Sequence, residues 1–200
     1  MSAKKKTHRQ LQKENTKQLI LNTAYQMFGE KGYSETTMRL LAERAGVGLG
    51  TIFKHFPDKP SLLVEAYQED LGKIISEAFK TIPEAGIQDQ LIHVTRKIYN
   101  FYASNRAFSR TLIKESLFLD GEHGKVLDAQ LIAFLEKVGM FIAAAVKRGE
   151  LPPETDVFYA VQAFGAFYFS VLVMALKKPT FNTEEELKIL GNLIKNYLNL

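Results

Sequence analysis

Three side chains near position 50, Thr51, Lys54 and His55, are of the types that donate hydrogen bonds to nucleic-acid base edges. On a helix their spacing places all three on one face. The neighbouring Gly48 and Gly50 add no bulk, so a helix here can come close to a ligand surface. A face of small, hydroxylic and basic residues suits the major groove of DNA.

Residues for other chemistries are scattered or missing. The four histidines, His8, His55, His93 and His123, are far apart, and the chain has no cysteine, so no metal site is expected. Neither a G-x-x-x-x-G-K-[ST] phosphate loop nor a G-x-S-x-G nucleophile elbow occurs. We therefore expect no catalytic residues and no cofactor. An enzyme using the helical domain remains an alternative, although no residue set nominates a reaction.

The residues near position 50 belong to a segment, 37–59, that predicts two short helices joined by a glycine turn. Thr37 is a good N-cap for the first helix, and Gly46 can adopt the left-handed conformation that ends it. The second helix should run over 49–56 and turn Val47, Ile52 and Phe56 inward. For the first helix the expected buried residues are Leu40, Leu41 and Ala45.

The preceding segment supplies a further helix, which makes a three-helix unit. The apolar residues of this helix recur at helical spacing, and Gly32 is expected to end it. Tyr33 is expected to pack at that end. The apolar face consists of Ile20, Ala24, Met27 and Phe28.

Residues 17–63 resemble the DNA-binding domain of the tetracycline-repressor (TetR) family. Three motifs carry the resemblance: A-x-x-x-F-x-x-x-G-Y from Ala24, T-x-R-x-L-A-x-x-A-G-V from Thr37, and G-x-I-F-x-H-F-x-D-K-x-x-L from Gly50. Because so many landmarks keep a fixed spacing, the match is specific.

The resemblance implies roles for individual residues. Thr37 and Arg39 would meet the edge of the DNA site, the second helix would enter the major groove, and Lys59 would hold a phosphate. The family usually has tyrosine where Phe53 stands and serine where Gly48 stands, so a phosphate contact from the tyrosine hydroxyl is absent and Phe53 is expected to pack. The expected DNA-binding set is Thr37, Arg39, Gly48, Leu49, Gly50, Thr51, Lys54, His55 and Lys59.

The distribution of charge and the positions of helix-ending residues divide the chain into three parts. Residues 1–60 hold 11 Lys and Arg against 5 Asp and Glu, whereas 61–200 hold 15 against 17, so the positive charge lies on the DNA module. We expect a basic disordered arm over 1–14, a helix-turn-helix domain over 15–60, and a ligand-binding and dimerisation domain over 61–200. The absence of cysteine and of an apolar run after the N-terminal lysines predicts a cytoplasmic protein.

The larger domain is also predicted to be helical, which gives an all-α fold of about nine helices. Asp58 should cap a long helix over 59–81, and Thr183 with Glu186 should form a capping box that opens the last helix. The other predicted helices cover 87–104, 106–118, 123–148, 157–176 and 184–198.

Residues 157–176 carry no charge, which on length alone permits a membrane anchor as an alternative. Gln162 and Ser170 lie inside the segment, and its small residues suit close helix packing, so a buried helix in a soluble protein is favoured. The resemblance implies that the last two helices pair with a second copy in a four-helix bundle. The expected interface residues are Phe158, Gln162, Ala166, Ser170, Leu190, Leu193 and Tyr197.

Aromatic residues are abundant in the larger domain, and some are expected to line a cavity for an apolar ligand. The resemblance places an effector pocket among the fourth to seventh helices, whose occupation would swing the long helix over 59–81. Candidate lining residues are His93, Arg96, Tyr99, Asn100, Tyr102, Phe108, Phe134, Phe141, Phe164 and Tyr168.

The favoured interpretation is a homodimeric transcriptional regulator that does no catalysis. We expect a repressor that binds a palindromic operator in double-stranded DNA and is released by a small apolar or amphipathic effector, without membrane attachment.

Overall fold

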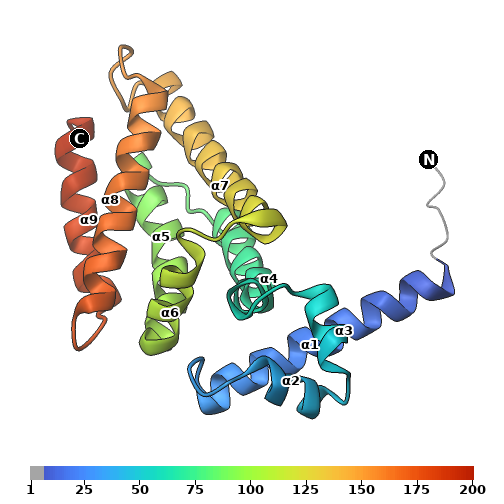
Figure 1. The fold of residues 1–200 in the computed structure, drawn as a ribbon. Helices are drawn as coiled ribbons and strands as arrows, with labels where there is room; N and C mark the ends of the chain where they lie inside the picture. The colour runs from blue at the N-terminus through green and yellow to red at the C-terminus, as the bar shows by residue number, and fades with distance from the viewer. Residues whose placement is uncertain (1–6) are drawn as a thin grey trace. The chain divides into compact units, whose positions relative to one another are not determined.

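The computed structural model describes residues 7–200 and contains nine α-helices in that range, with no strand (Figure 1). In chain order they are α1 (His8–Lys31), α2 (Met38–Ala45), α3 (Leu49–His55), α4 (Lys59–Lys80), α5 (Ile87–Ser104), α6 (Arg106–Ser116), α7 (Gly121–Lys147), α8 (Val157–Lys177) and α9 (Thr183–Leu198). The predicted all-α class is confirmed.

Contacts divide the chain into two compact units. The DNA-side unit contains the chain to Glu69 and, in addition, Thr111–Gly124. The effector-side unit contains Asp70–Arg110 and Lys125–Leu200. The DNA-side unit is therefore assembled from two stretches that are far apart in sequence.

In the DNA-side unit, α1 and α2 pack together, and α2 packs on α3. Its core includes Ile20, Phe28, Leu41, Ile52 and Phe56, each at most 2% exposed. These are the residues that helical spacing places on the inner faces, so their burial drives the packing of the three helices.

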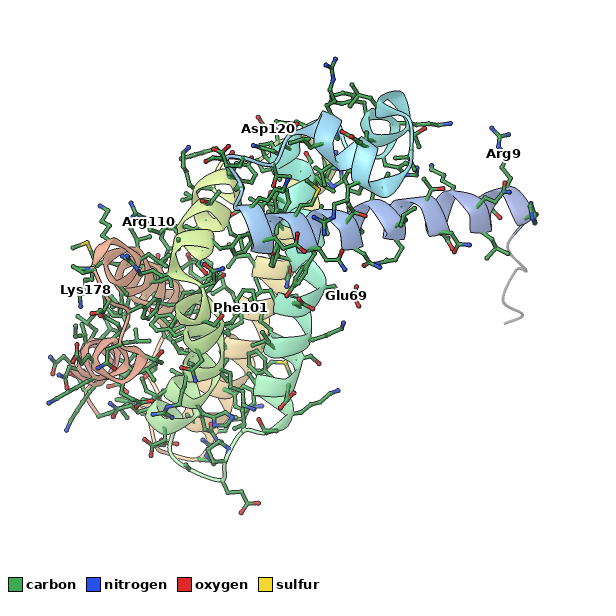
Figure 2. All side chains as sticks on the ribbon, turned by 90° about the horizontal axis from the view of Figure 1, so that it is seen from below. Arg9, Glu69, Phe101, Arg110, Asp120 and Lys178 are labelled. Carbon is green, nitrogen blue, oxygen red and sulfur yellow. The ribbon has the colours of Figure 1, made fainter. Side chains whose placement is uncertain are left out.

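Helix α1 begins earlier than predicted. A capping box at Thr7 and Gln10 opens the helix, so residues 8–14, which we expected in a disordered arm, are helical. Residues 1–6 lie outside the described range. Figure 2 shows Arg9 on the outer turns of α1, pointing away from the other side chains of this unit.

In the effector-side unit, α9 packs against α5 and α8, and α5 also touches α8 (Figure 1). Asp156 caps α8 by accepting from the backbone N–H groups of Phe158 and Tyr159. Two helices, α7 and α8, are long and apolar enough to span a membrane by length and composition alone. Core helices of soluble proteins pass the same test.

The last helix is capped differently from the prediction. Asn182, not Thr183, accepts hydrogen bonds from the N–H groups of Glu184 and Glu185. Glu186 is 1% exposed and pairs with Lys178 instead of closing a capping box. A buried carboxylate needs a cation more than a second backbone partner, which explains the difference.

Candidate DNA interface and effector domain

The turn between α2 and α3 has the geometry of a helix-turn-helix. The Thr37 hydroxyl accepts from the Leu40 N–H at 3.2 Å and caps α2. Gly46 ends α2 with φ of 66°, in the left-handed region that only glycine enters at no steric cost. The chain then reverses within three residues and enters α3 at Leu49.

The inner face of this motif is largely as predicted. Ile52 and Phe56 are fully buried, and Leu41 and Ala45 are buried on α2. Leu40 is 37% exposed, so its predicted burial is wrong. The inward stripe of this short helix runs through Leu41, Ala42 and Ala45 instead.

The outer face of α3 carries most of the predicted DNA-binding residues. Gly50 and Lys54 are exposed, whereas Leu49, Thr51 and His55 are half-buried. Gly48 begins this face without a side-chain cap, and on the α2 side Thr37 and Arg39 are exposed. The structure thus brings the small, hydroxylic and basic residues onto one accessible surface.

Positive charge gathers at the C-terminal end of α3. Burial lowers the pKa of the His55 imidazole, and positive charges nearby lower it further. Those charges belong to Lys13, Lys17 and Lys54. His55 is therefore neutral at pH 7, and the lysines supply the positive field that phosphate groups require.

Lys59, at the start of α4, is held in place by Tyr33. Its ammonium donates to the Tyr33 carbonyl at 2.9 Å and lies 4.1 Å from the centroid of the Tyr33 ring. Burial, followed by the nearby Glu115 carboxylate, raises the pKa of Tyr33, so its ring stays neutral. One N–H of Lys59 is used internally, which leaves two for another acceptor.

Glu65 joins three elements of the DNA-side unit. Its carboxylate pairs with Lys17 on α1 and with Nδ1 of His123, 3.0 Å away on the first turn of α7. The His123 ring stacks on Phe56 with 5.8 Å between centroids, and the Lys17 ammonium lies 5.9 Å from the same ring. Phe56 directly follows α3, so the start of α7 contacts the residue that anchors the recognition helix.

The segment before α7 is also tied to this unit. The Tyr33 hydroxyl lies 3.5 Å from Oε2 of Glu115 on α6. A Cβ at Gly124 would stand 1.8 Å from the Leu119 carbonyl oxygen, so glycine is required for the α6–α7 turn. Residues of α6 and the start of α7, as well as α4, therefore contact the three-helix part of this unit.

In the effector-side unit, the predicted aromatic residues form one connected cluster. Tyr99, Phe134, Phe141, Phe164 and Tyr168 are linked by ring contacts, with Phe79 and Phe181 joining them. Neighbouring centroids are 5.3 to 6.3 Å apart. Tyr102 is buried and Phe108 half-buried. The rings fill one another's space, so a ligand would have to displace some of them.

The buried tyrosines contribute polar hydroxyl groups to this otherwise apolar cluster. The Tyr99 hydroxyl donates to the Tyr168 carbonyl at 2.6 Å. Burial raises the pKa of Tyr99, Tyr102 and Tyr168, so all three hydroxyls stay protonated at neutral pH.

The three polar residues of α5 that were predicted to bind the ligand make other contacts or are exposed. Arg96 forms a two-pronged pair with Glu184 at 2.8 and 3.1 Å, His93 contacts the Thr81 hydroxyl at 3.1 Å, and Asn100 is exposed. These groups fasten α5 to its neighbours or face solvent. Sequence spacing misled here because it cannot reveal partners as distant as Glu184.

A small cavity of about 10 Å³ lies beside the cluster, among α5, α7, α8 and α9. Leu91, Ile142, Phe164 and Tyr197 are among its lining residues. Its walls are apolar, but the volume matches a single water rather than a hydrocarbon chain. Of the predicted ligand residues, Phe164 borders it.

The predicted dimer residues on α8 form an exposed face. Phe158 is 65% exposed, and Gln162, Ala166 and Ser170 are exposed along the same side of the helix. On α9, Tyr197 is exposed and Leu193 half-buried. Leu190 is fully buried within the chain and cannot meet a partner, so its assignment is wrong. On α8 and α9 four further large apolar residues are exposed and were not predicted: Tyr159, Phe169, Met174 and Ile189.

Comparison with known proteins adds independent evidence. Residues 20–66 match the family described as bacterial regulatory proteins, tetR family. The HTH-type transcriptional repressor AcnR of Corynebacterium diphtheriae is 29% identical over 123 residues, which cover 60% of this chain and 64% of the relative. The fatty acid metabolism regulator protein of Bacillus subtilis is 24% identical over 144 residues, or 72% of this chain and 74% of that one.

A solved structure shares the fold at greater length. FadR of Thermus thermophilus, described as a repressor in complex with lauroyl-CoA, superposes with a TM-score of 0.71 and 20% identity. The match covers 89% of this chain and 92% of that one. The helix-turn-helix geometry and the match over residues 20–66 agree, and these residues form a DNA-binding domain of the tetR family of bacterial regulatory proteins.

Proposed function

We propose that this regulator is a homodimeric repressor that binds a palindromic operator through α3 of each copy. The observation that carries the proposal is the exposed face of α3. Gly50 and Lys54 are exposed on this face, whereas Ile52 and Phe56 are buried on the opposite one. Two copies of such a face, related by a two-fold axis, read half-sites that are about one helical turn or a multiple of it apart.

The exposed apolar face of α8 and α9 supports the dimer. Phe158, Tyr159 and Met174 are each more than half exposed, which is costly for a protein in water unless a second copy covers them. The interface we propose consists of Phe158, Gln162, Ala166, Ser170, Leu193 and Tyr197, together with the exposed residues Tyr159, Phe169, Met174 and Ile189. Leu190 is no longer included.

Lys54 is expected to contribute to sequence reading. In Lys54→Ala, affinity for the operator should fall by roughly 10-fold or more, with a smaller loss on random DNA, since a base contact is worth about 1–3 kcal/mol. The matched control is Lys147→Ala, which removes an exposed lysine at the end of α7. Fluorescence anisotropy with operator and scrambled duplexes measures both. Unchanged operator affinity and sequence preference in Lys54→Ala would contradict the role of α3.

For the effector we propose an amphipathic acyl thioester. The relatives point to fatty-acid metabolism, and the aromatic cluster around Phe134 and Tyr168 offers apolar surface for an acyl chain. The rings contact one another in the structure, so binding is expected to separate them. Their displacement would pass along α4 and α7, both of which continue into the DNA-side unit.

Lauroyl-CoA is the probe for this proposal. We expect it to weaken operator binding by about 5- to 150-fold, and operator DNA to weaken lauroyl-CoA binding by the same factor, because coupling is reciprocal. Calorimetric titration with and without operator measures the factor, with free CoA as the negative control. Equal lauroyl-CoA affinities in both titrations would show that the cluster does not regulate DNA binding.

Two variants on α7 locate the acyl site. Phe134→Trp adds bulk inside the cluster and should abolish lauroyl-CoA binding while sparing operator affinity. Met140→Trp, at a position that is 71% exposed on the same helix, should leave both unchanged. If Phe134→Trp binds lauroyl-CoA normally, the acyl chain lies elsewhere.

A further inference from the structure

Phe53 is the exposed aromatic residue of the recognition helix. Its side chain is 48% exposed although Ile52 before it and Phe56 after it are fully buried. The expected packing of Phe53 therefore leaves about half of its side chain exposed within the chain. A large apolar ring held on the surface of a seven-residue helix loses the stabilisation that burial would give it.

The neighbours of Phe53 leave its ring accessible. Leu49 stands one turn earlier on the same side of α3, and Gly50 lies between them. A Cβ added at Gly50 would meet no heavy atom within 4 Å, so that position is open. One flank of α3 therefore carries half-buried Leu49 and the exposed ring of Phe53, beside the open position at Gly50.

The chemistry of this surface restricts what it can recognise. A phenyl ring neither donates nor accepts a hydrogen bond, so it cannot read polar base edges or hold a phosphate. The apolar group that base pairs present in the major groove is the C5-methyl group of thymine. Thr51 and Lys54 remain available for polar edges.

We propose that Phe53 is a specificity-determining residue that packs against a thymine methyl group in each operator half-site. The proposal rests on the DNA-binding role of α3 and assigns it one base.

The test uses full-length protein and an operator obtained by selection from random duplex DNA. Each thymine is replaced in turn by deoxyuridine, which removes the methyl group and keeps every hydrogen-bonding group. For the wild type, one substitution per half-site should weaken binding by about four-fold, the value for removing one buried methyl group. Changing both symmetric positions should weaken it by about 16-fold.

Variants assign that difference to Phe53. Phe53→Ala should bind thymine and deoxyuridine duplexes equally well at this position, and Phe53→Tyr, which keeps the ring, should retain the preference for thymine. Phe118→Ala, at a residue that is 88% exposed in the α6–α7 turn, should behave as the wild type. Thermal unfolding checks that Phe53→Ala is folded.

The outcomes separate this inference from the proposed function. If Phe53→Ala shows the same deoxyuridine penalties as the wild type at every position, or binds operator with unchanged affinity, Phe53 does not read thymine. If selection yields no preferred sequence at all, the operator-binding function itself is wrong.

Discussion

Ala166→Glu is expected to convert the dimer into a monomer and to lower operator affinity by about 100-fold or more. Ala166 lies in the middle of the exposed face of α8. A carboxylate there would be buried without a partner in the proposed interface, which strongly disfavours association. Once the two recognition helices are unlinked, the gain from simultaneous binding, about 10²–10⁴ in affinity, is lost.

Analytical ultracentrifugation and operator titration measure both effects. The matched control is Ala133→Glu, which places the same charge at an exposed position of α7. It should stay dimeric and bind operator normally. If Ala133→Glu dissociates the protein and Ala166→Glu does not, the interface lies on α7. A wild type that remains monomeric at micromolar concentration would refute the dimer altogether.

Phe56→Ala is expected to remove about 3–5 kcal/mol of stability from the DNA-side unit, as large-to-small changes of buried aromatic residues do. Phe56 is fully buried, and both His123 and Lys17 lie against its ring. Its loss leaves a cavity beneath α3 and weakens the contact with α7. Operator binding should disappear at temperatures where the effector-side unit is still folded.

Phe53→Ala is the control for this prediction, because it removes the same ring from the same region at a half-exposed position. It should cost less than about 1 kcal/mol. Hydrogen exchange resolves the two units separately. Equal destabilisation by the two variants would show that Phe56 is not the anchor of α3.

The ends of α2 and most of the inner faces of α2 and α3 were predictable because their signals are local. Thr37 and Gly46 act on backbone groups within a few residues, and the structure confirms both. The cap of α9 was not, since Asn182 and Thr183 are both good N-caps and sequence does not choose between adjacent candidates. Burial of Glu186 beside Lys178 decided the choice.

The positions of side chains on α3 were easier to predict than those of residues in the effector-side unit, for the same reason. Thr51 and Lys54 take their positions from the two turns of α3 alone. Arg96 and Leu190 depend on distant segments: Glu184 captures the guanidinium of Arg96, and Leu190 is buried within the chain's own fold. Tyr33, Glu65 and His123 were likewise missed as a junction, because no sequence pattern links residues so far apart.

The division of the DNA-side unit into two stretches has a consequence for synthesis on the ribosome. Phe56 and Glu65 emerge early, but their partner His123 is made 58 residues after Glu65 and 67 residues after Phe56. The nascent helix-turn-helix therefore completes its packing only after residue 124 has left the exit tunnel. A fragment ending at residue 69 lacks the contacts of His123 with Phe56 and Glu65. Such a fragment would present α3 without part of the packing that supports it.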